Sequence, residues 1–355
     1  ALGRGRGDDF DPDHPFLVAL RTDPVLSAVK LIAEPWDVGM HGWRTGQFPP
    51  PFMEWNDRYR DAVRRFWVGD VRAQLHHRPG HGLQELATRL AGSRDLFGHR
   101  DRGPTASINF VAAHDGFTTA DLVAYDHKHN EANGENNHDG SHGNGSWNHG
   151  VEGPTDDPQV LAARSLAIRN LLGTLLLSTG IPMINAGDEL GRSQGGNNNP
   201  YCQDTSTSWI NWDLEPWQRD LLATTSHLTR VRQSLPALRQ RVWAMGRQVH
   251  DDGTRDMEWY AADGAPMGDR WAEGHRLVQL YVAGAWMGWD SALLVVNGGV
   301  DDVEVTLPTA PGAEAYRLLW DSTWPRPRDG GDPMSPGPVT VGATSLQVYA
   351  ASDTT

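Results

Sequence analysis

Short apolar runs alternate with helical patterns over the first 237 residues of the chain. Four of the runs are predicted strands, at residues 29–33, 52–55, 108–113 and 181–186. Helical periodicity follows in residues 58–68, 158–176 and 217–232. The second helix has Asp157 as a predicted N-cap and Pro158 in its first turn. Because strands that alternate with helices are typical of a parallel sheet, residues 1–237 are predicted to form four βα units of an α/β fold.

The pattern changes after about residue 240. Short apolar strands now follow one another between turn residues, at 293–297, 303–307, 316–320 and 346–349. This pattern predicts a small antiparallel β-sandwich. A chain of 355 residues is long enough for two domains at roughly 150 residues each. We therefore expect the βα domain in residues 1–237 and the β-sandwich domain in residues 238–355.

Two long loops interrupt the βα region, at residues 40–51 and 126–155. Structureless loops longer than about 12–15 residues are usually functional or disordered. Both loops come after a strand whose end carries a carboxylate, since Glu34 follows the first predicted strand and Asp115 follows the third. The carboxyl ends of parallel strands meet at one edge, so the acids and loops are expected to converge there. Acids at strand ends also serve as helix caps and salt-bridge partners, and spacing alone leaves that alternative open.

Composition narrows the classes of function. Lys and Arg number 31 against 45 Asp and Glu, and the net charge of −14 would repel a nucleic acid. No apolar run has the length of a lipid-spanning segment, so no membrane partner is expected. The single cysteine, Cys202, favours a reducing, cytoplasmic compartment. Trp is abundant, with 15 residues against 7 Tyr, and although most are expected in the core, an indole suits the C–H face of a sugar ring.

Specific segments carry a family resemblance. Ala-Glu-Pro-Trp-Asp at 33–37 and Ala-His-Asp-Gly at 113–116 resemble two characteristic segments of the α-amylase superfamily of retaining glycoside hydrolases. Four further segments, at 46–51, 54–57, 127–135 and 196–204, are similar to glycogen debranching enzymes of the isoamylase type. The resemblance covers nearly the whole chain. It implies a (β/α)8 TIM barrel, of which the four predicted units would be strands five to eight, followed by the β-sandwich.

The resemblance also implies roles for individual residues. Glu34 matches the general acid/base, Asp115 the aspartate that stabilises the transition state, and His114 the histidine that hydrogen-bonds the sugar. A glycosidic oxygen must be protonated to leave, so the acid needs a raised pKa from an apolar wall such as Trp36. Three further residues are implied substrate contacts, namely Lys128, Asn133 and Tyr201.

The nucleophile of the resembled enzymes has no counterpart here. In the family it is an aspartate that ends the fourth barrel strand, a few residues before a Leu-Gly-Arg similar to residues 2–4. Asp8, Asp9, Asp11 and Asp13 lie in a Gly- and Pro-punctuated loop with no preceding strand, so they are not substitutes. A closed barrel has eight strands, and half of one exposes two edge strands and an apolar inner face. We therefore expect the chain to be the C-terminal half of a barrel, inactive alone, with a missing N-terminal half as its partner.

The loop histidines suggest a metal site, but Asn and Gly lie between them and no cysteine joins them, so neither a metal nor a cofactor is expected. These are His127, His129, His138, His142 and His149. The function implied is hydrolysis of α-1,6 branch linkages in glycogen-like α-glucans by a retaining double displacement. One alternative is a glucan-binding or assembly partner without turnover. Another is a related α-glucan transferase or trehalose-releasing enzyme, because the superfamily shares these carboxylates.

Overall fold

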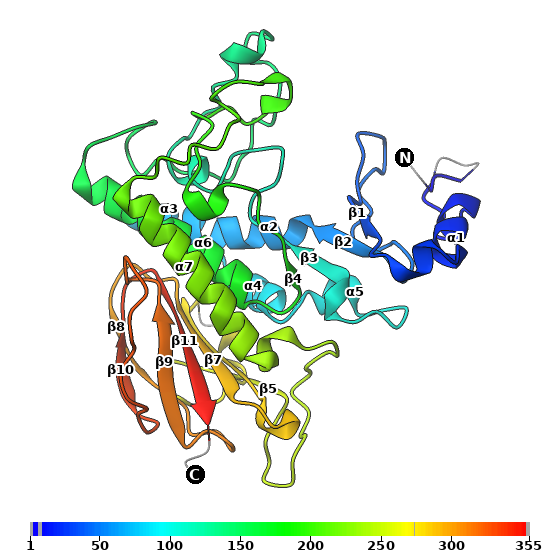
Figure 1. The fold of residues 1–355 in the computed structure, drawn as a ribbon. Helices are drawn as coiled ribbons and strands as arrows, with labels where there is room; N and C mark the ends of the chain where they lie inside the picture. The colour runs from blue at the N-terminus through cyan, green and yellow to red at the C-terminus, as the bar shows by residue number, and fades with distance from the viewer. Residues whose placement is uncertain (1–2, 6–8, 273, 353–355) are drawn as a thin grey trace.

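The predicted parallel sheet is present in the computed structural model, which describes residues 3–5, 9–272 and 274–352 (Figure 1). Leu2 and Asp8 lie outside the described residues. The sheet has four parallel strands in chain order. They are β1 (Ile32–Ala33), β2 (Met53–Asn56), β3 (Ser107–Asn109) and β4 (Ile181–Pro182). The prediction of four parallel strands is thereby confirmed.

Three of these strands are shorter than the apolar runs that predicted them. β1 lies at the sheet edge, where Val29 and Ile32 are 50% and 51% exposed and only β2 offers backbone partners. Beyond β3, residues 110–113 stay buried but leave the hydrogen-bonded ladder as the chain turns toward Asp115. The apolar pattern reports burial, which continues beyond the ladder at β3, and it does not fix where backbone pairing begins and ends.

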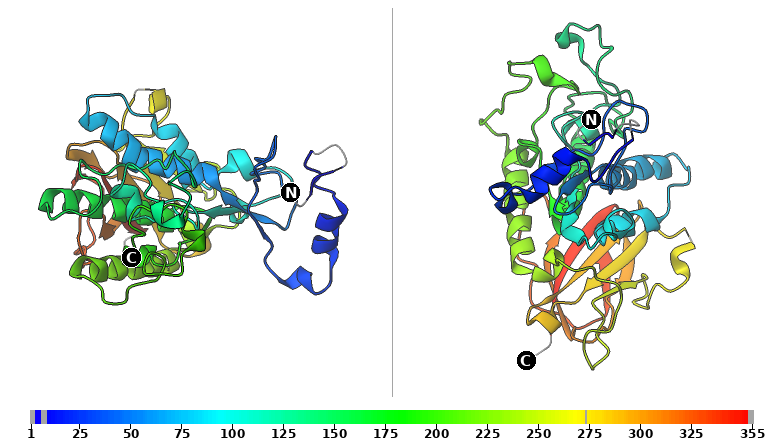
Figure 2. Two further views of the ribbon diagram at one scale, coloured as in Figure 1. Left: turned by 90° about the horizontal axis from the view of Figure 1, so that it is seen from above. Right: turned by 90° about the vertical axis from the view of Figure 1, so that its right-hand side faces the viewer.

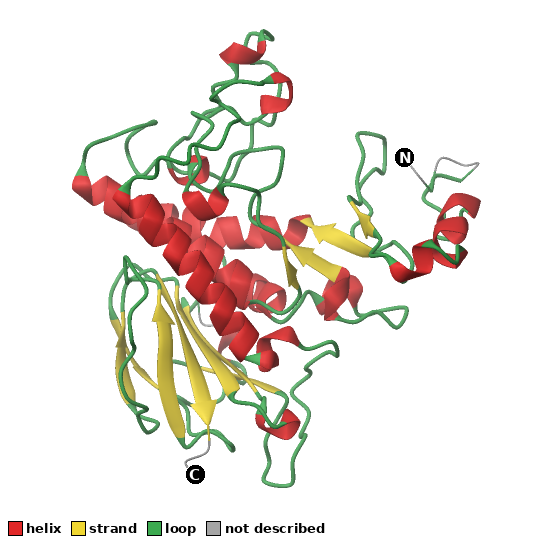
Figure 3. Cartoon of the chain, viewed as in Figure 1, coloured by secondary structure: helices red, strands yellow, loops and turns green. Residues whose placement is uncertain are grey.

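Most of the helices form a layer against this sheet and against the C-terminal strands (Figures 1 and 3). The described α-helices are α1 (Pro15–Thr22), α2 (Asp57–Arg64), α3 (Asp70–Leu75), α4 (Leu83–Leu90), α5 (Arg94–Phe97), α6 (Pro158–Leu177) and α7 (Pro216–Ser234). The helix predicted over 58–68 is interrupted, because a π-helical turn at Arg65–Gly69 separates α2 from α3. Asp157 caps α6 as predicted, accepting a hydrogen bond from the Gln159 backbone N–H at 2.8 Å.

Helix α6 packs against both layers of the molecule. On one side the Tyr59 hydroxyl donates to the Thr174 carbonyl at 3.0 Å, and the Trp67 indole donates to the Thr174 hydroxyl at 2.8 Å. On the other side Gly173 approaches Trp320 so closely that a Cβ would lie 2.6 Å from the indole. The helix is long and apolar enough to cross a membrane, but 67% of the relevant window is buried in the protein, as in a core helix.

The C-terminal strands form two antiparallel sheets that share a hydrophobic core. The five-stranded sheet has the order β5 (Met257–Tyr260), β6 (Leu277–Val282), β7 (Ser291–Asn297), β11 (Ser345–Ser352) and β9 (Ala315–Asp321). The second sheet pairs β10 (Pro338–Val341) with β8 (Val303–Thr306). The antiparallel strands predicted from the sequence are confirmed, whereas β5, β6 and β10 were not predicted. The domain boundary at residue 237 stays a prediction.

Candidate active site

The parallel sheet places the two predicted acids at the same edge. Glu34 follows β1 directly, and Asp115 lies six residues beyond the end of β3. Strand β2 lies between them and pairs in parallel with both neighbours. Because all three strands run in one direction, their carboxyl ends open toward one side of the sheet.

A row of aromatic rings joins these two strand ends across β2. Trp55, on β2, has its ring centroid 6.4 Å from Trp36 and 5.7 Å from His114. Trp36 lies two residues after Glu34, and His114 immediately precedes Asp115. The predicted residues Trp36 and His114 therefore both lie next to the indole of Trp55, on the strand between β1 and β3.

Glu34 is exposed, and its surroundings are open. It lines a small cavity of about 30 Å³ together with Trp36, Asp37 and Arg4. The Arg4 guanidinium donates to Asp37 at 2.6 Å and holds the pKa of that carboxyl well below its usual range. The half-buried Trp36 stands beside Glu34, so part of the predicted apolar wall is present but does not enclose the acid.

Asp115 is also exposed, but the chain around it is fixed by hydrogen bonds. The backbone N–H of Gly116 donates to the Asn198 carbonyl at 2.9 Å. Before the acid, the buried Arg64 donates from Nε to the Val111 carbonyl at 2.7 Å, and burial lowers the pKa of Arg64 to about 9. Asp115 lines a cavity of about 620 Å³, which is separate from the one at Glu34.

A buried ion pair under the first long loop was not predicted from the sequence. Glu54 on β2 is fully buried and its carboxylate accepts from Arg102 at 2.6 Å and from the Gly46 N–H at 2.6 Å. Burial raises the pKa of Glu54, and the charge of Arg102 opposes that shift. Asp57 fixes the same loop a second time, accepting from the Trp43 indole and the Thr45 hydroxyl at 2.7 Å each.

A second unpredicted carboxylate supports the segment that follows Asp115. Asp188 accepts from the Thr119 backbone N–H at 3.0 Å and from the Thr119 hydroxyl at 2.7 Å. Its carboxyl is buried, and burial raises its pKa to about 6. Its position after the predicted fourth strand was the only sequence signal that could have suggested a role near the site.

The second long loop is tied to residues 196–204 by amide side chains. Asn130 donates from Nδ2 to Asn198 Oδ1 at 2.8 Å, and its own Oδ1 accepts from the Asn198 N–H at 2.9 Å. The predicted substrate contact Asn133 lies in this network, donating to Asp139 at 2.7 Å and to the Asn199 carbonyl at 2.9 Å. The network holds the loop over the same edge of the sheet as Asp115.

The structure places the other two predicted contacts differently. Lys128 is only 7% exposed, and its Nζ donates to the Asp139 carbonyl at 2.5 Å, so its ammonium is used within the loop. Tyr201 is 71% exposed and donates its hydroxyl to Glu135 at 2.7 Å, a hydrogen bond that raises the pKa of Tyr201 to about 12. Of the two, Tyr201 offers a free ring face at the surface.

The loop histidines do not gather with other donors. His149 is stacked on Trp147 with ring centroids 4.1 Å apart, and burial lowers its pKa. His129 pairs with Glu152 at 3.2 Å. Among residues 3–5, 9–272 and 274–352, no group of three or more His, Cys, Asp or Glu side chains could hold a metal ion.

Comparisons with known proteins connect this site to a family. No protein-family profile matches the chain. A protein named glycogen operon protein GlgX homolog from Mycobacterium tuberculosis is 44% identical over 349 residues, covering 95% of this chain and 46% of that protein. A glycogen debranching enzyme from Serratia proteamaculans is 44% identical over 306 residues, covering 86% of this chain and 43% of the enzyme. The chain therefore spans about half the length of the curated relatives it matches.

Solved structures share the fold. The pullulanase from Bacillus acidopullulyticus matches with a TM-score of 0.66 and 17% sequence identity, over 96% of this chain and 36% of the pullulanase. A pullulanase from Anoxybacillus sp. LM18-11, solved with maltotetraose, matches with a TM-score of 0.61 and 18% identity over 96% of this chain and 41% of its own. These findings confirm the resemblance inferred from the motifs: the chain is a homologue of proteins named glycogen operon protein GlgX homolog and glycogen debranching enzyme, and it shares the fold of the pullulanases.

Proposed function

We propose that this chain is the acid/base-bearing part of a glycoside hydrolase that cleaves α-1,6 branch linkages in glycogen-like α-glucans. The observation that carries this proposal is the contact of Trp36 and His114 with the single indole of Trp55. Glu34 and Asp115 are close in sequence to these rings, and this supports the proposal that both carboxylates act on one sugar ring. The names of the 44% identical relatives supply the substrate class.

The proposed mechanism divides the work between the two acids. Glu34 in its protonated form donates a proton to the glycosidic oxygen, and the bond between that oxygen and the anomeric carbon breaks. The sugar acquires oxocarbenium-like positive charge, which the carboxylate of Asp115 stabilises. His114 hydrogen-bonds the same sugar. In the second half of the reaction Glu34 accepts a proton from the water that attacks the anomeric carbon.

Retention of configuration needs a third carboxylate as nucleophile, about 5–5.5 Å from the acid. The carboxylates that follow β4 do not line the cavity at Glu34: Asp188 accepts from Thr119, and Glu189 accepts from the Gly187 N–H at 2.9 Å. We therefore propose that the nucleophile comes from polypeptide outside these 355 residues and that the chain alone does not turn over glucan.

A half barrel fits the same proposal. The sheet has free edges at β1 and β4, and Val29 and Ile32 at the β1 edge are about half exposed. Figures 1 and 2 show α1 lying beyond this edge, away from the helical layer. Further parallel strands that pair with these edges would complete a (β/α)8 barrel.

The test is turnover by the natural gene product that carries this chain. Glu34→Gln should lower kcat on glycogen by about 10²–10⁴-fold, because the proton donor is lost. It should retain far more activity on an aryl glucoside, whose leaving group needs no proton. Glu131→Gln, an exposed loop carboxylate, is the matched control and should leave kcat unchanged. A Glu34→Gln enzyme that debranches glycogen at the parental rate would refute the assignment.

A further inference from the structure

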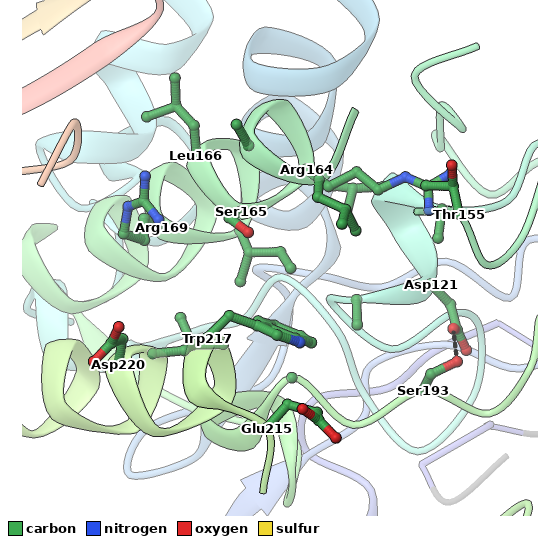
Figure 4. A pocket seen from close by; sticks show the side chains of 18 of the residues that line it. Asp121, Thr155, Arg164, Ser165, Leu166, Arg169, Ser193, Glu215, Trp217 and Asp220 are labelled. Atoms are coloured by element: carbon green, nitrogen blue, oxygen red, sulfur yellow. Dashed lines mark hydrogen bonds between the residues drawn. The ribbon is translucent and has the colours of Figure 1, made fainter. Parts of the chain in front are cut away.

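A large cavity lies outside the candidate active site. It is a groove of about 780 Å³ between the N-terminal halves of α6 and α7, and it contains none of the predicted site residues. Figure 4 shows this groove from close by. Volumes of roughly 300–1,000 Å³ are typical of small-ligand sites. The groove therefore has room for several sugar rings or a ligand of similar size.

The groove contains an aromatic side chain that is both exposed and held in place. Trp217, in the first turn of α7, is 41% exposed and extends across the groove in Figure 4. The edge of its ring packs on Gly191, which has a φ of +62° and where a Cβ would lie 2.3 Å from the indole. The neighbouring Gln218 ties α7 to the same turn, donating to the Leu190 carbonyl at 2.8 Å. Only a glycine at position 191 allows this packing. The packing holds the Trp217 indole in place as a pre-organised flat surface.

The opposite wall supplies both apolar and hydroxyl groups. Leu161 on α6 is 44% exposed, and Ser165 follows it one turn later with its hydroxyl toward the groove. Tyr125 also lines the groove. An indole face opposite hydroxyl-bearing and aliphatic side chains suits a pyranose, whose ring has an apolar C–H face and a polar rim.

The charged groups around the groove are already used by the protein. Arg164 donates to the carbonyls of Gly153 at 2.7 Å and of Asn148 at 2.9 Å, and Arg169 donates from Nε to the Ser322 carbonyl at 2.6 Å. Glu215 forms the N-terminal capping box of α7. Three acids line the groove with the two cations, namely Asp121, Glu215 and Asp220. Asp121 is buried and accepts from the Ser193 hydroxyl and the Gln194 N–H, and Asp220 pairs with Arg326 at 3.4 Å, so each of these charges already has a partner within the protein. A neutral occupant is therefore favoured over an anion or a cation.

We propose that the groove between α6 and α7 is an accessory binding site for an α-glucan chain, with Trp217 stacked on one glucose ring and Ser165 hydrogen-bonded to a sugar hydroxyl. The identity of the sugar rests on the proposed function. The site also lies well for this role. Helices that follow parallel strands begin near the edge where those strands end, so the groove opens on the same side as Glu34 and Asp115. A branched polymer bound there would raise the local concentration of its branch points at the active site.

The test compares a polymeric and a small substrate in the natural gene product. Trp217→Ala removes the stacking surface, and Ser165→Phe fills the groove from the opposite wall. Each variant should raise KM for glycogen about tenfold. For a small branched oligosaccharide that reaches only the active site, KM and kcat should both stay unchanged. Trp289→Ala, which removes a 56% exposed tryptophan outside the groove, is the matched control and should leave KM unchanged.

A second measurement separates this inference from the proposed function. In a Glu34→Gln background, glycogen binding is measured by retardation in a native gel that contains glycogen, with thermal melting as the check on folding. Weaker retardation of both folded groove variants supports the accessory site even if the parental protein hydrolyses no α-1,6 linkage. Parental retardation in either folded variant refutes it. Equal losses on the polymeric and the small substrate also refute it, because Trp217 would then act on the active site. If another part of the protein covers the groove, the groove variants should melt at lower temperatures and bind glycogen as the parent does. That outcome also refutes the accessory site.

Discussion

The two acids of the candidate site stand in unequal surroundings. Asp115 has a hydrogen-bonded support on each side, from Arg64 before it and from Asn198 and Asp188 after it. Glu34 follows a two-residue edge strand, is exposed, and lines a cavity of only about 30 Å³. The comparison teaches that a middle strand brings a pre-organised carboxylate, because neighbours on both sides fix the chain. An edge strand leaves its carboxylate dependent on whatever packs next to it.

The largest expected effect is on kcat, and it follows from substitution of the well-supported acid, Asp115. Asp115→Asn keeps the shape of the side chain but removes the charge that the cationic transition state needs, so kcat on glycogen should fall at least about 100-fold with little change in melting temperature. Steady-state kinetics of the natural gene product measures this. Asp156→Asn, at an exposed loop position, provides the control. Unchanged kcat in Asp115→Asn would remove Asp115 from the site.

The strongest anchor on the Glu34 side is the buried pair under the first loop. Arg102→Met leaves Glu54 buried without its cation, which should cost about 3–5 kcal/mol in the free energy of unfolding. Denaturant unfolding at neutral pH measures the loss, and the double variant Arg102→Met with Glu54→Leu should recover part of it. A single variant as stable as the parent would show that the loop does not depend on this pair.

An effect of intermediate size is expected on the pH dependence of stability, and it comes from Asp188. Its carboxyl has a pKa of about 6 in the folded protein, above the value of about 3.8 expected when unfolded. The folded state therefore binds more protons between these values, and stability falls as the pH rises from about 4 to 6. Asp188→Asn does not titrate, so its unfolding free energy relative to the parent should rise across this range. Parallel curves for the two proteins would contradict the raised pKa.

The smallest effect is expected at the exposed end of the loop network. Tyr201→Phe removes the hydrogen bond to Glu135, but both groups are at the surface, so the free energy of unfolding should hardly change. The ring remains, and KM for glycogen should stay within about twofold of the parent if stacking is its contribution. Tyr201→Ala should then raise KM several-fold. A large loss of stability in Tyr201→Phe would instead make this residue part of the scaffold.

The sequence predicted the four parallel strands and the positions of Glu34 and Asp115 after two of them, because buried parallel strands are continuous apolar runs followed by punctuating residues such as Pro35 and Gly116. It could not reveal Glu54 or Asp188, because a carboxylate beside a strand has the same sequence pattern whether it faces water or an arginine. Lys128 illustrates the reverse case. A lysine in a polar loop suggests a ligand contact, but its ammonium binds carbonyls of its own loop.

The close packing of Gly173 on Trp320 has a consequence for how the molecule can be divided. The helix that carries this glycine also anchors Tyr59 and Trp67 beneath the parallel strands. A protein truncated after residue 237 would expose to water the apolar side of α6 that packs against the C-terminal sheet. The C-terminal sheet is thus a structural requirement of the βα region, and an engineer who wishes to transplant the catalytic edge would have to carry both layers together.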